Sequence, residues 1–405
     1  MADGITRIAV EGFKSIAKRQ EIEIRPLTIL AGANSSGKSS IMQPLLMLKQ
    51  TLEASYDPGP LKIDGPNAKF TSSEQFLSRV NGGHGLLSIS LDTEGLSLQV
   101  TFGKGESGIE ILEQKETYPN GSVRVLRPEM TKDEIQDAFD QETPWARLFR
   151  ERCFLHWGIA QGMPMNPFQL EFMLQAVIHV SGLRGNPGRT YQVTGVGPHY
   201  PGTFEHYVAS VISNWQSRDH ERYRALNRAL EHIGLAERVE SRNLNEAELE
   251  LQVNRVPGGR LDDLVSIADV GFGVSQTLPV LVALQAANDA QLIYLEEPEI
   301  HLHPRAQTRL ADVLADAAKR GVRVVAETHS SLLLRAIQTL VAKSMLDPAL
   351  VQLHWFSRDR AGITQITSAT PDENGAFGDW PEDFGDVALQ SEKDYLDAVE
   401  TKLAR

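Results

Sequence analysis

The sequence predicts an α/β fold with a mixed central sheet, an antiparallel β layer and a helical insertion. Two strand-like apolar runs, Leu27 to Ala31 and Leu292 to Leu295, are each followed by polar segments and then by helix-like runs. This order is typical of a largely parallel sheet between helices. Between Leu86 and Val125, apolar and polar residues alternate, with turn-forming residues at intervals. That pattern indicates an antiparallel meander beside the main sheet.

The segment 32–39, Gly-Ala-Asn-Ser-Ser-Gly-Lys-Ser, is a complete phosphate-binding loop between a predicted strand and a predicted helix. Its glycines let the backbone approach phosphate oxygens, and the lysine can contact the β- and γ-phosphates. The Ser39 hydroxyl can coordinate Mg²⁺. We therefore predict that ATP and Mg²⁺ bind here. The predicted contacts are Gly32, Asn34, Ser35, Ser36, Gly37, Lys38, Ser39 and Ser40.

Carboxylates and a histidine follow two later predicted strands. Glu296 and Glu297 come directly after the first, and His329 follows the second, which spans 322–326. Ligands bind at the carboxyl ends of strands in open α/β sheets. One carboxylate can hold Mg²⁺ and the next can deprotonate an attacking water, while the histidine can contact a γ-phosphate. Before them lies a Gly/Ser segment, 269–276, containing Gly273 and Ser275, whose position before a helix indicates a second anion-binding corner.

Composition is that of an ordinary globular protein: 405 residues, 41% hydrophobic and 23% charged, with a net charge of -13. Bulk charge therefore does not favour nucleic acid or an anionic membrane, and any contact with DNA needs a local basic patch. A single cysteine excludes an internal disulfide and fits a reducing compartment. Without a signal pattern or a long apolar run, we expect a cytoplasmic protein that does not enter the membrane.

We predict four regions along the chain. They are an N-terminal lobe with the phosphate loop and β meander (1–130), a mainly helical insertion (131–255), a C-terminal lobe (256–345) and a small C-terminal extension (346–405). Within the insertion, helices are expected at about 131–149 and 203–233. A hairpin is expected at 351–366. No sustained heptad repeat is present, so long coiled-coil arms are not expected.

Three polar groups have both a structural and a functional interpretation. His301 and His303 alternate beside the carboxylates, but no cysteine or third histidine accompanies them, which favours a loop over a metal site. Arg184 and Arg189 could contact phosphate or be solvated. A basic cluster could bind nucleic acid, but a solvated helix face is the favoured interpretation. Its members are Arg218, His220, Arg222, Arg224 and Arg228.

Together these motifs resemble the ABC-type ATPases of the RecF/SMC/OLD group, especially the short prokaryotic AAA ATPases. The resemblance rests on the phosphate loop, the signature-like segment, Glu-Glu-Pro-Glu, the run 300–304 (Ile-His-Leu-His-Pro) and Glu-Thr-His-Ser at 327–330. The segment 181–191 is similar to a recurring Gly-Pro-Leu-Arg element of these proteins. Residues 378–384 are similar to a small C-terminal domain of unknown function found on many of them.

The resemblance implies an ATPase head that pairs head to tail around ATP. In that arrangement Glu296 is the metal-side carboxylate, Glu297 the general base and His329 the γ-phosphate sensor, while Ser275 contacts the partner's nucleotide. Gln75 is a candidate for a metal-sensing glutamine, on position alone. Two departures bear on these roles: Glu296 replaces the usual aspartate, and the signature lacks the order Leu-Ser-Gly-Gly.

The implied function is a slow ATPase switch that controls a separately encoded effector, a nuclease or toxin, in anti-phage defence. The expected assembly is a homo-oligomer built on a nucleotide-dependent dimer. Alternatives are a DNA repair or recombination ATPase that grips DNA, and a scaffold that binds ATP without hydrolysing it. A subunit of a membrane transporter is disfavoured, because the β meander and C-terminal extension have no evident docking role there.

Overall fold

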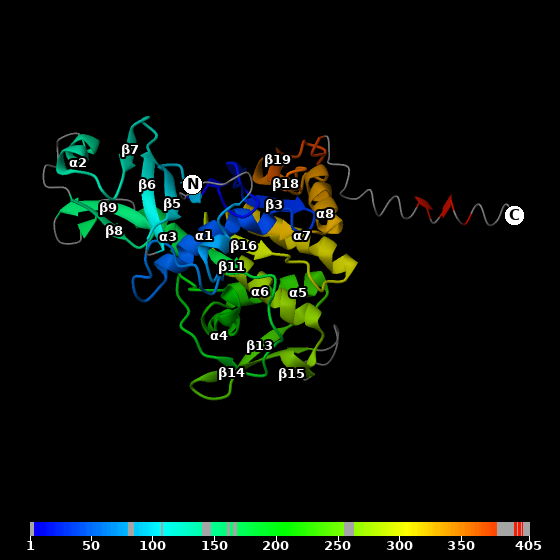
Figure 1. The fold of residues 1–405 in the computed structure, drawn as a ribbon. Coiled ribbons are helices and arrows are strands. Elements are labelled where there is room, and N and C mark those ends of the chain that lie inside the picture. The colour runs from blue at the N-terminus through cyan, green and yellow to red at the C-terminus, as the bar shows by residue number, and fades with distance from the viewer. Residues whose placement is uncertain are drawn as a thin grey trace.

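The computed structural model describes residues 4–79, 85–106, 108–139, 147–159, 163–164, 168–254 and 263–378, with five isolated positions between 393 and 399. Residues 379–384 of the segment that resembles a C-terminal domain lie outside the described residues. The described elements form an α/β structure with several sheets, arranged around one central sheet (Figure 1). The predicted fold class is confirmed.

The central sheet holds the strands that the sequence placed before its polar motifs. Five strands are parallel, and a sixth pairs antiparallel at one edge. In spatial order they are β11 (Ile178–Val180), β16 (Leu292–Glu296), β17 (Arg323–Thr328), β3 (Leu27–Gly32), β18 (Val351–Arg358) and β19 (Thr364–Ala369). All six residues of β3 are buried, as expected of a strand covered on both faces. The carboxyl ends of β16, β17, β3 and β18 therefore meet along one edge.

Each face of the central sheet packs against its own hydrophobic core. One core includes Ile29, Leu295 and Ala326 and continues into five helices. These are α4 (Val208–Arg218), α5 (His220–Ile233), α6 (Phe272–Ala286), α7 (Pro304–Lys319) and α8 (Ser331–Ala342). The other core includes Leu30 and Tyr294 and lies against α1 (Lys38–Leu52) and the antiparallel sheet.

The predicted meander is confirmed and is part of a six-stranded antiparallel sheet. Its order is β2 (Gln20–Glu23), β1 (Arg7–Glu11), β4 (Leu86–Asp92), β5 (Ser97–Lys104), β6 (Ile109–Thr117) and β7 (Val123–Leu126). Alternate residues such as Leu87, Ile89 and Leu91 are buried. The two N-terminal strands thus join the meander and do not extend the central sheet.

The middle of the chain contains more strands than predicted. Helix α2 (Lys132–Ala138) ends well before residue 149, and 147–151 is strand β8 (Arg147–Glu151). It pairs with β9 (Phe154–Ile159), which also pairs with β10 (Met163–Pro164), and α3 (Phe168–Gln175) follows. The predicted helix at 203–233 is a 3-10 turn, η3 (Phe204–His206), and two helices separated by Asp219, which caps the second. A small sheet holds β12 (Tyr191–Gln192), β13 (Val239–Asn243), β14 (Glu248–Asn254) and β15 (Leu264–Ser266).

Two segments that we expected outside the main sheet belong to it. Strand β11 lies inside the predicted helical insertion, yet it pairs in parallel with β16. The predicted hairpin after residue 350 is confirmed, but its first strand, β18, pairs with β3 from Val351 to Phe356. The hairpin therefore lies beside the phosphate loop and supports it, which its place in a small C-terminal extension did not suggest.

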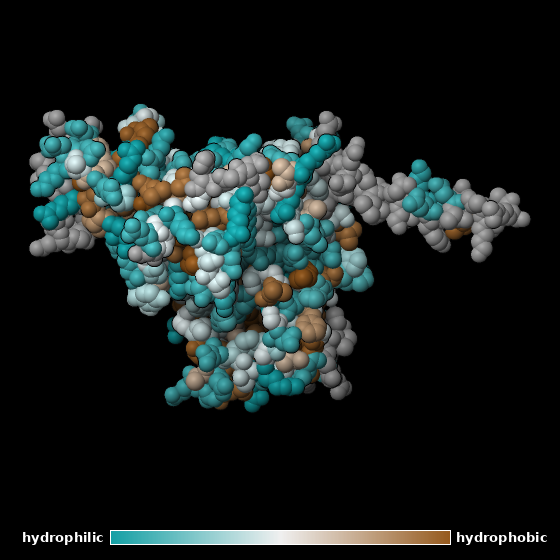
Figure 2. All heavy atoms as spheres, viewed as in Figure 1, coloured by the Kyte–Doolittle hydropathy of each residue, from teal (hydrophilic) through white to brown (hydrophobic). Residues whose placement is uncertain are grey.

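No helix in the described residues exceeds the 16 residues of α7, so the described part of the chain contains no long coiled coil. Within that part no helix is both long and apolar enough to cross a bilayer. On the face shown in Figure 2, hydrophobic residues are scattered among hydrophilic ones.

Candidate functional site

The phosphate loop connects β3 to α1 and has the backbone shape that its glycines allow. Gly32 and Gly37 have φ of 145° and 109°, in the region that favours glycine. A Cβ at Gly37 would lie 2.4 Å from the Thr364 Oγ1, and one at Gly32 would lie 2.3 Å from the Phe356 carbonyl oxygen. The Thr364 hydroxyl also donates to the Ser36 carbonyl, at 2.8 Å. The hairpin of β18 and β19 therefore packs against the loop and fixes its backbone.

Lys38, the first residue of α1, is folded onto the loop that precedes it. Its Nζ donates to the carbonyls of Gly32 and Ala33, at 3.0 and 2.9 Å. Burial lowers the pKa of this lysine, and the nearby carboxylates, Glu327 first, oppose that shift. The Ser36 Oγ is buried and has no hydrogen-bond partner among the described residues. An unpaired buried hydroxyl in a glycine-rich loop at a helix N-terminus fits an anion, here a phosphate group.

A cavity of about 540 Å³ opens onto this loop. It is lined by loop residues and by side chains from the ends of β16, β17 and β18. Its lining residues are Lys14, Asn34, Ser35, Ser36, Gly37, Lys38, Ser39, Ser40, Gln43, Glu297, Glu327, His329 and Arg358. Residues from both ends of the sequence thus meet at one edge of the sheet, where open α/β sheets bind ligands.

Glu297 and His329 face each other across this cavity. The Glu297 Oε1 lies 3.6 Å from the His329 Nε2, and both side chains remain partly exposed. Glu297 adopts a φ of 43°, and its N–H donates to the Glu327 carbonyl at 2.9 Å. Burial, followed by the charge of Lys38, lowers the pKa of His329, although Glu297 opposes this. The histidine is therefore neutral at pH 7 and has a single ring N–H, and the Gly32 backbone lies within hydrogen-bond reach of the ring.

The carboxylates at the strand ends differ in their partners. Glu296, predicted on the metal side, has one oxygen 3.1 Å from the His179 Nε2 and the other accepting from the Gly182 N–H at 3.0 Å. Burial raises its pKa, but these hydrogen bonds, His179 first, outweigh burial and leave the pKa lowered. Glu327 instead accepts from the Ser39 hydroxyl at 3.0 Å and from the Tyr294 hydroxyl at 2.8 Å. Burial raises the pKa of Glu327.

These oxygen donors suit Mg²⁺. Magnesium is commonly held by one or two protein oxygens together with substrate phosphates and water, so a complete protein cage is not required. The described residues contain no group of three or more His, Cys, Asp or Glu side chains placed to hold a metal ion by themselves. Ser39 and a strand-end carboxylate therefore fit a magnesium ion that arrives with a nucleotide.

The signature-like segment lies outside this cavity in its own chain. Gly271 caps α6, and neither Gly273 nor Ser275 is among the cavity-lining residues. The Ser275 hydroxyl donates to the Phe272 carbonyl at 3.2 Å. Phe272 is 52% exposed. Within one chain, the structure does not bring this segment to the phosphate loop.

Gln75 and the two loop arginines have other partners. Gln75 is exposed in η1 (Ser73–Gln75), exchanges two hydrogen bonds of 2.9 Å with Thr71, and does not line the cavity. Arg184 is buried and donates to the carbonyls of Gln276, Glu296 and Glu297. Arg189 is exposed and paired with Asp269. Arg184 therefore positions the backbone of the strand end.

The remaining polar groups have structural contacts. His303 caps α7 by accepting from the Arg305 N–H, and the His301 ring lies 5.9 Å from that of Phe272. Two arginines of the basic cluster bind local groups: Arg222 donates to Ala286 and Asn288, and Arg224 to His220. These contacts favour the structural interpretation of both groups.

Four cavity residues were not predicted from the sequence. Lys14 lies in the connection between the first two strands, with its Nζ 2.7 Å from the Gln43 Oε1, and Gln43 is in the first turns of α1. Glu327 immediately precedes the Thr-His pair at the end of β17, and Arg358 ends β18. A search for polar residues at the carboxyl ends of all predicted parallel strands would have found Glu327.

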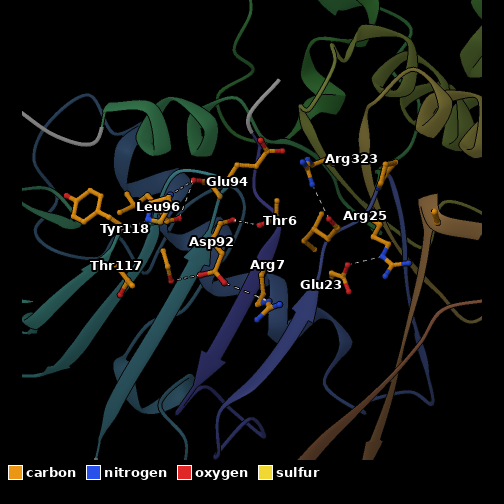
Figure 3. A pocket seen from close by; sticks show the side chains of 16 residues that line it. Thr6, Arg7, Glu23, Arg25, Asp92, Glu94, Leu96, Thr117, Tyr118 and Arg323 are labelled. Atoms are coloured by element: carbon orange, nitrogen blue, oxygen red, sulfur yellow. Dashed lines mark hydrogen bonds and ion pairs between the residues drawn. The ribbon is translucent and has the colours of Figure 1, made fainter. Parts of the chain in front are cut away.

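A second cavity, of about 800 Å³, lies at the opposite edge of the central sheet (Figure 3). Its walls include the residues just before β3 and the start of β17. Its arginines already have partners: Arg7 pairs with Asp92, Arg25 with Glu23, and Arg323 donates to the Ile24 carbonyl. Because it lies at the amino ends of the strands and its cations are paired, this cavity is a weaker candidate.

Sequence models of two families match separate parts of the chain. One, an AAA ATPase domain, matches residues 4–138. The other is an AAA domain described as a putative AbiEii toxin of a type IV TA system, and it matches residues 213–335. No curated protein matches the chain. The first match contains the phosphate loop, and the second contains Glu297, Glu327 and His329.

Several solved structures of SMC heads are similar to the chain. A crystal structure of an SMC head bound to the C-winged helix domain of ScpA is 14% identical, covers 91% of this chain and 98% of that chain, and has a TM-score of 0.43. The SMC head domain from Thermotoga maritima is 14% identical, covers 90% of this chain and 98% of that chain, and has a TM-score of 0.39. A third structure is an SMC head with an extended coiled coil, bound to the C-terminal domain of ScpA derived from Pyrococcus furiosus. It is 12% identical, covers 98% of this chain and 100% of that chain, and has a TM-score of 0.46.

Proposed function

We propose that the chain is an ABC-type AAA ATPase of the RecF/SMC-like group and that it is an ATP-hydrolysing switch that dimerises around ATP; models of two AAA families match separate parts of it. One observation carries this proposal. A single cavity joins Lys38 and Ser39 to Glu297 and His329, although the chain segments that supply them lie far apart in sequence. Phosphate-binding groups and a carboxylate that can orient and deprotonate water are parts that ATP hydrolysis uses, and a neutral histidine can donate a hydrogen bond to the γ-phosphate.

In this proposal, the loop N–H groups, Lys38 and the Ser36 hydroxyl hold the phosphates. Ser39 and a strand-end carboxylate would hold Mg²⁺, which would supply neutralisation of the charge on the phosphate oxygens. Glu297 accepts a proton from the water that attacks the γ-phosphorus, while the bond from that phosphorus to the β–γ bridging oxygen breaks and ADP leaves. His329 donates a hydrogen bond to a γ-phosphate oxygen and loses this contact after hydrolysis.

The second copy supplies the signature-like segment. In one chain the N-terminus of α6 is outside the cavity, and Gly271 and Phe272 are exposed there. A helix N-terminus attracts anions. We therefore propose that α6 of one subunit closes on the nucleotide held by the other, so that the dimer depends on the γ-phosphate.

We test this function with Glu297→Gln, which removes the base and keeps the side-chain size. Turnover should fall by about 10²–10⁴-fold, the contribution typical of general base catalysis, and an ATP-bound dimer should accumulate in size-exclusion chromatography with light scattering. The matched control is Glu74→Gln, because Glu74 is exposed and paired with Arg79 outside the cavity. Unchanged turnover and unchanged dimer lifetime in Glu297→Gln would reject the assigned role.

The same assay separates the alternatives. A scaffold that binds ATP without hydrolysis would retain ATP and release no phosphate, with or without a partner protein. An ATPase that grips DNA would form longer-lived dimers on duplex DNA than in its absence. The net charge of -13 makes general attraction to DNA weak, so that such binding would need a local basic patch.

We further propose that the switch controls a separately encoded effector in anti-phage defence. The description of the family model that matches residues 213–335 refers to a toxin–antitoxin system and supports this choice. In the test, cells carry this gene, its neighbouring gene, or both, and are challenged with phage. Protection that requires both genes and an intact Lys38 supports the proposal; protection unaffected by Lys38→Ala contradicts it.

A further inference from the structure

Two glutamates occupy equivalent positions at the ends of adjacent strands. Glu296 ends β16, Glu327 lies near the end of β17, and the two are paired in the register of the sheet. Only one of these strands borders the strand before the phosphate loop. β17 pairs directly with β3, with Glu327 opposite Leu30, whereas β16 is one strand farther away.

The carboxylate of Glu296 is held on the side away from the loop. One oxygen contacts the His179 Nε2 and the other accepts from the Gly182 N–H. His179 is itself fixed, because its other ring nitrogen lies 3.0 Å from the Asn67 Nδ2 and its ring stacks on Tyr294 at a centroid distance of 5.4 Å. Turning Glu296 toward Ser39 would break two hydrogen bonds of a side chain that is mostly buried.

The carboxylate of Glu327 already lies at the phosphate loop. Its Oε1 accepts from the Ser39 hydroxyl, and its Oε2 accepts from the Tyr294 hydroxyl. The residue is 6% exposed, lines the same cavity as Lys38, and is the nearby carboxylate that most opposes the lowering of the Lys38 pKa by burial. A serine that donates its proton to this carboxylate keeps its oxygen lone pairs for a cation.

We propose that Glu327, and not Glu296, is the carboxylate that holds Mg²⁺ together with Ser39. This inference rests on the proposed function, since the ion arrives with a nucleotide. Tyr294 is then a positioning residue that orients the Glu327 carboxylate. Glu296 is also a positioning residue, because it ties the end of β16 to the segment after β11 and thereby fixes the backbone from which Glu297 projects.

The test compares Glu327→Gln with Glu296→Gln in the full chain. Each substitution removes one negative charge and keeps the size of the side chain. Binding of Mn²⁺ in the presence of ADP is measured by electron paramagnetic resonance, and binding of a fluorescent ADP analogue is measured in EDTA. Glu327→Gln should weaken Mn²⁺ binding by about 10–100-fold, as loss of a metal-orienting carboxylate does. Its metal-free ADP affinity should stay within about 3-fold, since no phosphate contact is lost.

Glu296→Gln should change Mn²⁺ affinity by less than about 3-fold, which is the weak end of the coupling that residues away from a site exert. A larger loss in Glu296→Gln than in Glu327→Gln would overturn the inference while leaving the proposed function intact. Failure of the wild-type chain to bind ADP in either condition would instead reject the proposed function and this inference with it.

If Glu327→Gln does not fold, two milder variants test whether Glu327 holds the metal ion. Glu327→Asp keeps the charge but moves it back from Ser39, and Tyr294→Phe removes only the hydroxyl that orients the carboxylate. Both should weaken Mn²⁺ binding and leave metal-free ADP binding unchanged. Wild-type Mn²⁺ affinity in both would contradict the assignment.

Discussion

The phosphate loop and the signature-like segment are both glycine-rich turns at a helix N-terminus, but their surroundings differ. The loop is enclosed: the hairpin of β18 and β19 packs behind it, and Glu297, which follows β16, and Glu327 of β17 line the same cavity. The N-terminus of α6 is open, with Gly271 and Phe272 exposed and no cavity-lining residue among Gly271, Gly273 and Ser275.

This difference is consistent with the proposed dimer, in which two copies of the chain have different roles at each nucleotide. In that proposal, one copy supplies the groups that hold the phosphates and activate water, and they line a single cavity. The α6 N-terminus is exposed and lies outside the cavity of its own chain, and in the proposal it meets the nucleotide of another subunit. The predictions that follow alter one of these two regions at a time, so that nucleotide binding and dimerisation can be separated.

The largest expected effect comes from the enclosed region. Lys38→Ala removes the only cation in the loop segment 32–39, and a hydrogen bond to a charged group contributes about 1.5–3 kcal/mol. We expect nucleotide affinity to fall about 100-fold, measured by titration with a fluorescent ATP analogue. The matched control is Lys69→Ala, an exposed lysine outside the cavity. Equal affinities in the two variants would show that the loop does not hold the phosphates.

Acid should destabilise the hairpin that supports the loop. His354 of β18 is buried and contacts the Glu23 carbonyl and the Ser368 hydroxyl. Burial lowers its pKa from 6.5 to about 4. Because the unfolded chain takes up this proton near pH 6.5 and the folded chain only near pH 4, this contribution to stability is complete above pH 6.5. It is lost as pH falls toward 4, by about 3 kcal/mol at most.

The measurement is the free energy of unfolding in urea from pH 7.5 to 4. The reference is His354→Gln, which cannot gain a proton in this range. The wild-type curve should fall more steeply than that of the variant between pH 6.5 and 4. Parallel curves would mean that His354 does not titrate differently in the two states.

A smaller effect is expected in the open region. Gly271→Asp places a carboxylate at the cap of α6, where no atom lies within 4 Å of the added Cβ and where aspartate is a favourable capping residue. The monomer should therefore fold and bind nucleotide as before. Dimerisation with ATP should weaken about 10-fold or more, because like charges would meet across the interface. Gly271→Ser is the neutral control, and equal dimerisation of both variants would contradict the proposed role of α6.

The parts that could be predicted from the sequence are those set by local pattern. The strand, loop and helix around Lys38 follow from neighbouring residues, as does the alternation in β4 to β7. Pairing of β18 with β3 could not be predicted, because parallel pairing of strands more than 300 residues apart has no local signal. Arg184 lies in a Gly/Pro-rich segment that suggested exposure, yet it is buried against carbonyls at least 92 residues away.

The smallest effect is expected at Gln75, which was chosen from its sequence position alone. Its side chain bonds to Thr71, it is exposed, and it lies outside the cavity. Gln75→Ala should therefore change Mn²⁺ affinity in the presence of ADP by less than about 2-fold, within the range of a surface substitution. In contrast, Gln43 lines the cavity and holds the Lys14 Nζ, so Gln43→Ala should alter nucleotide affinity more than Gln75→Ala does. If Gln75→Ala had the larger effect in both titrations, η1 would have to move to the phosphate loop when nucleotide binds, and the cavity described here would be only part of the site.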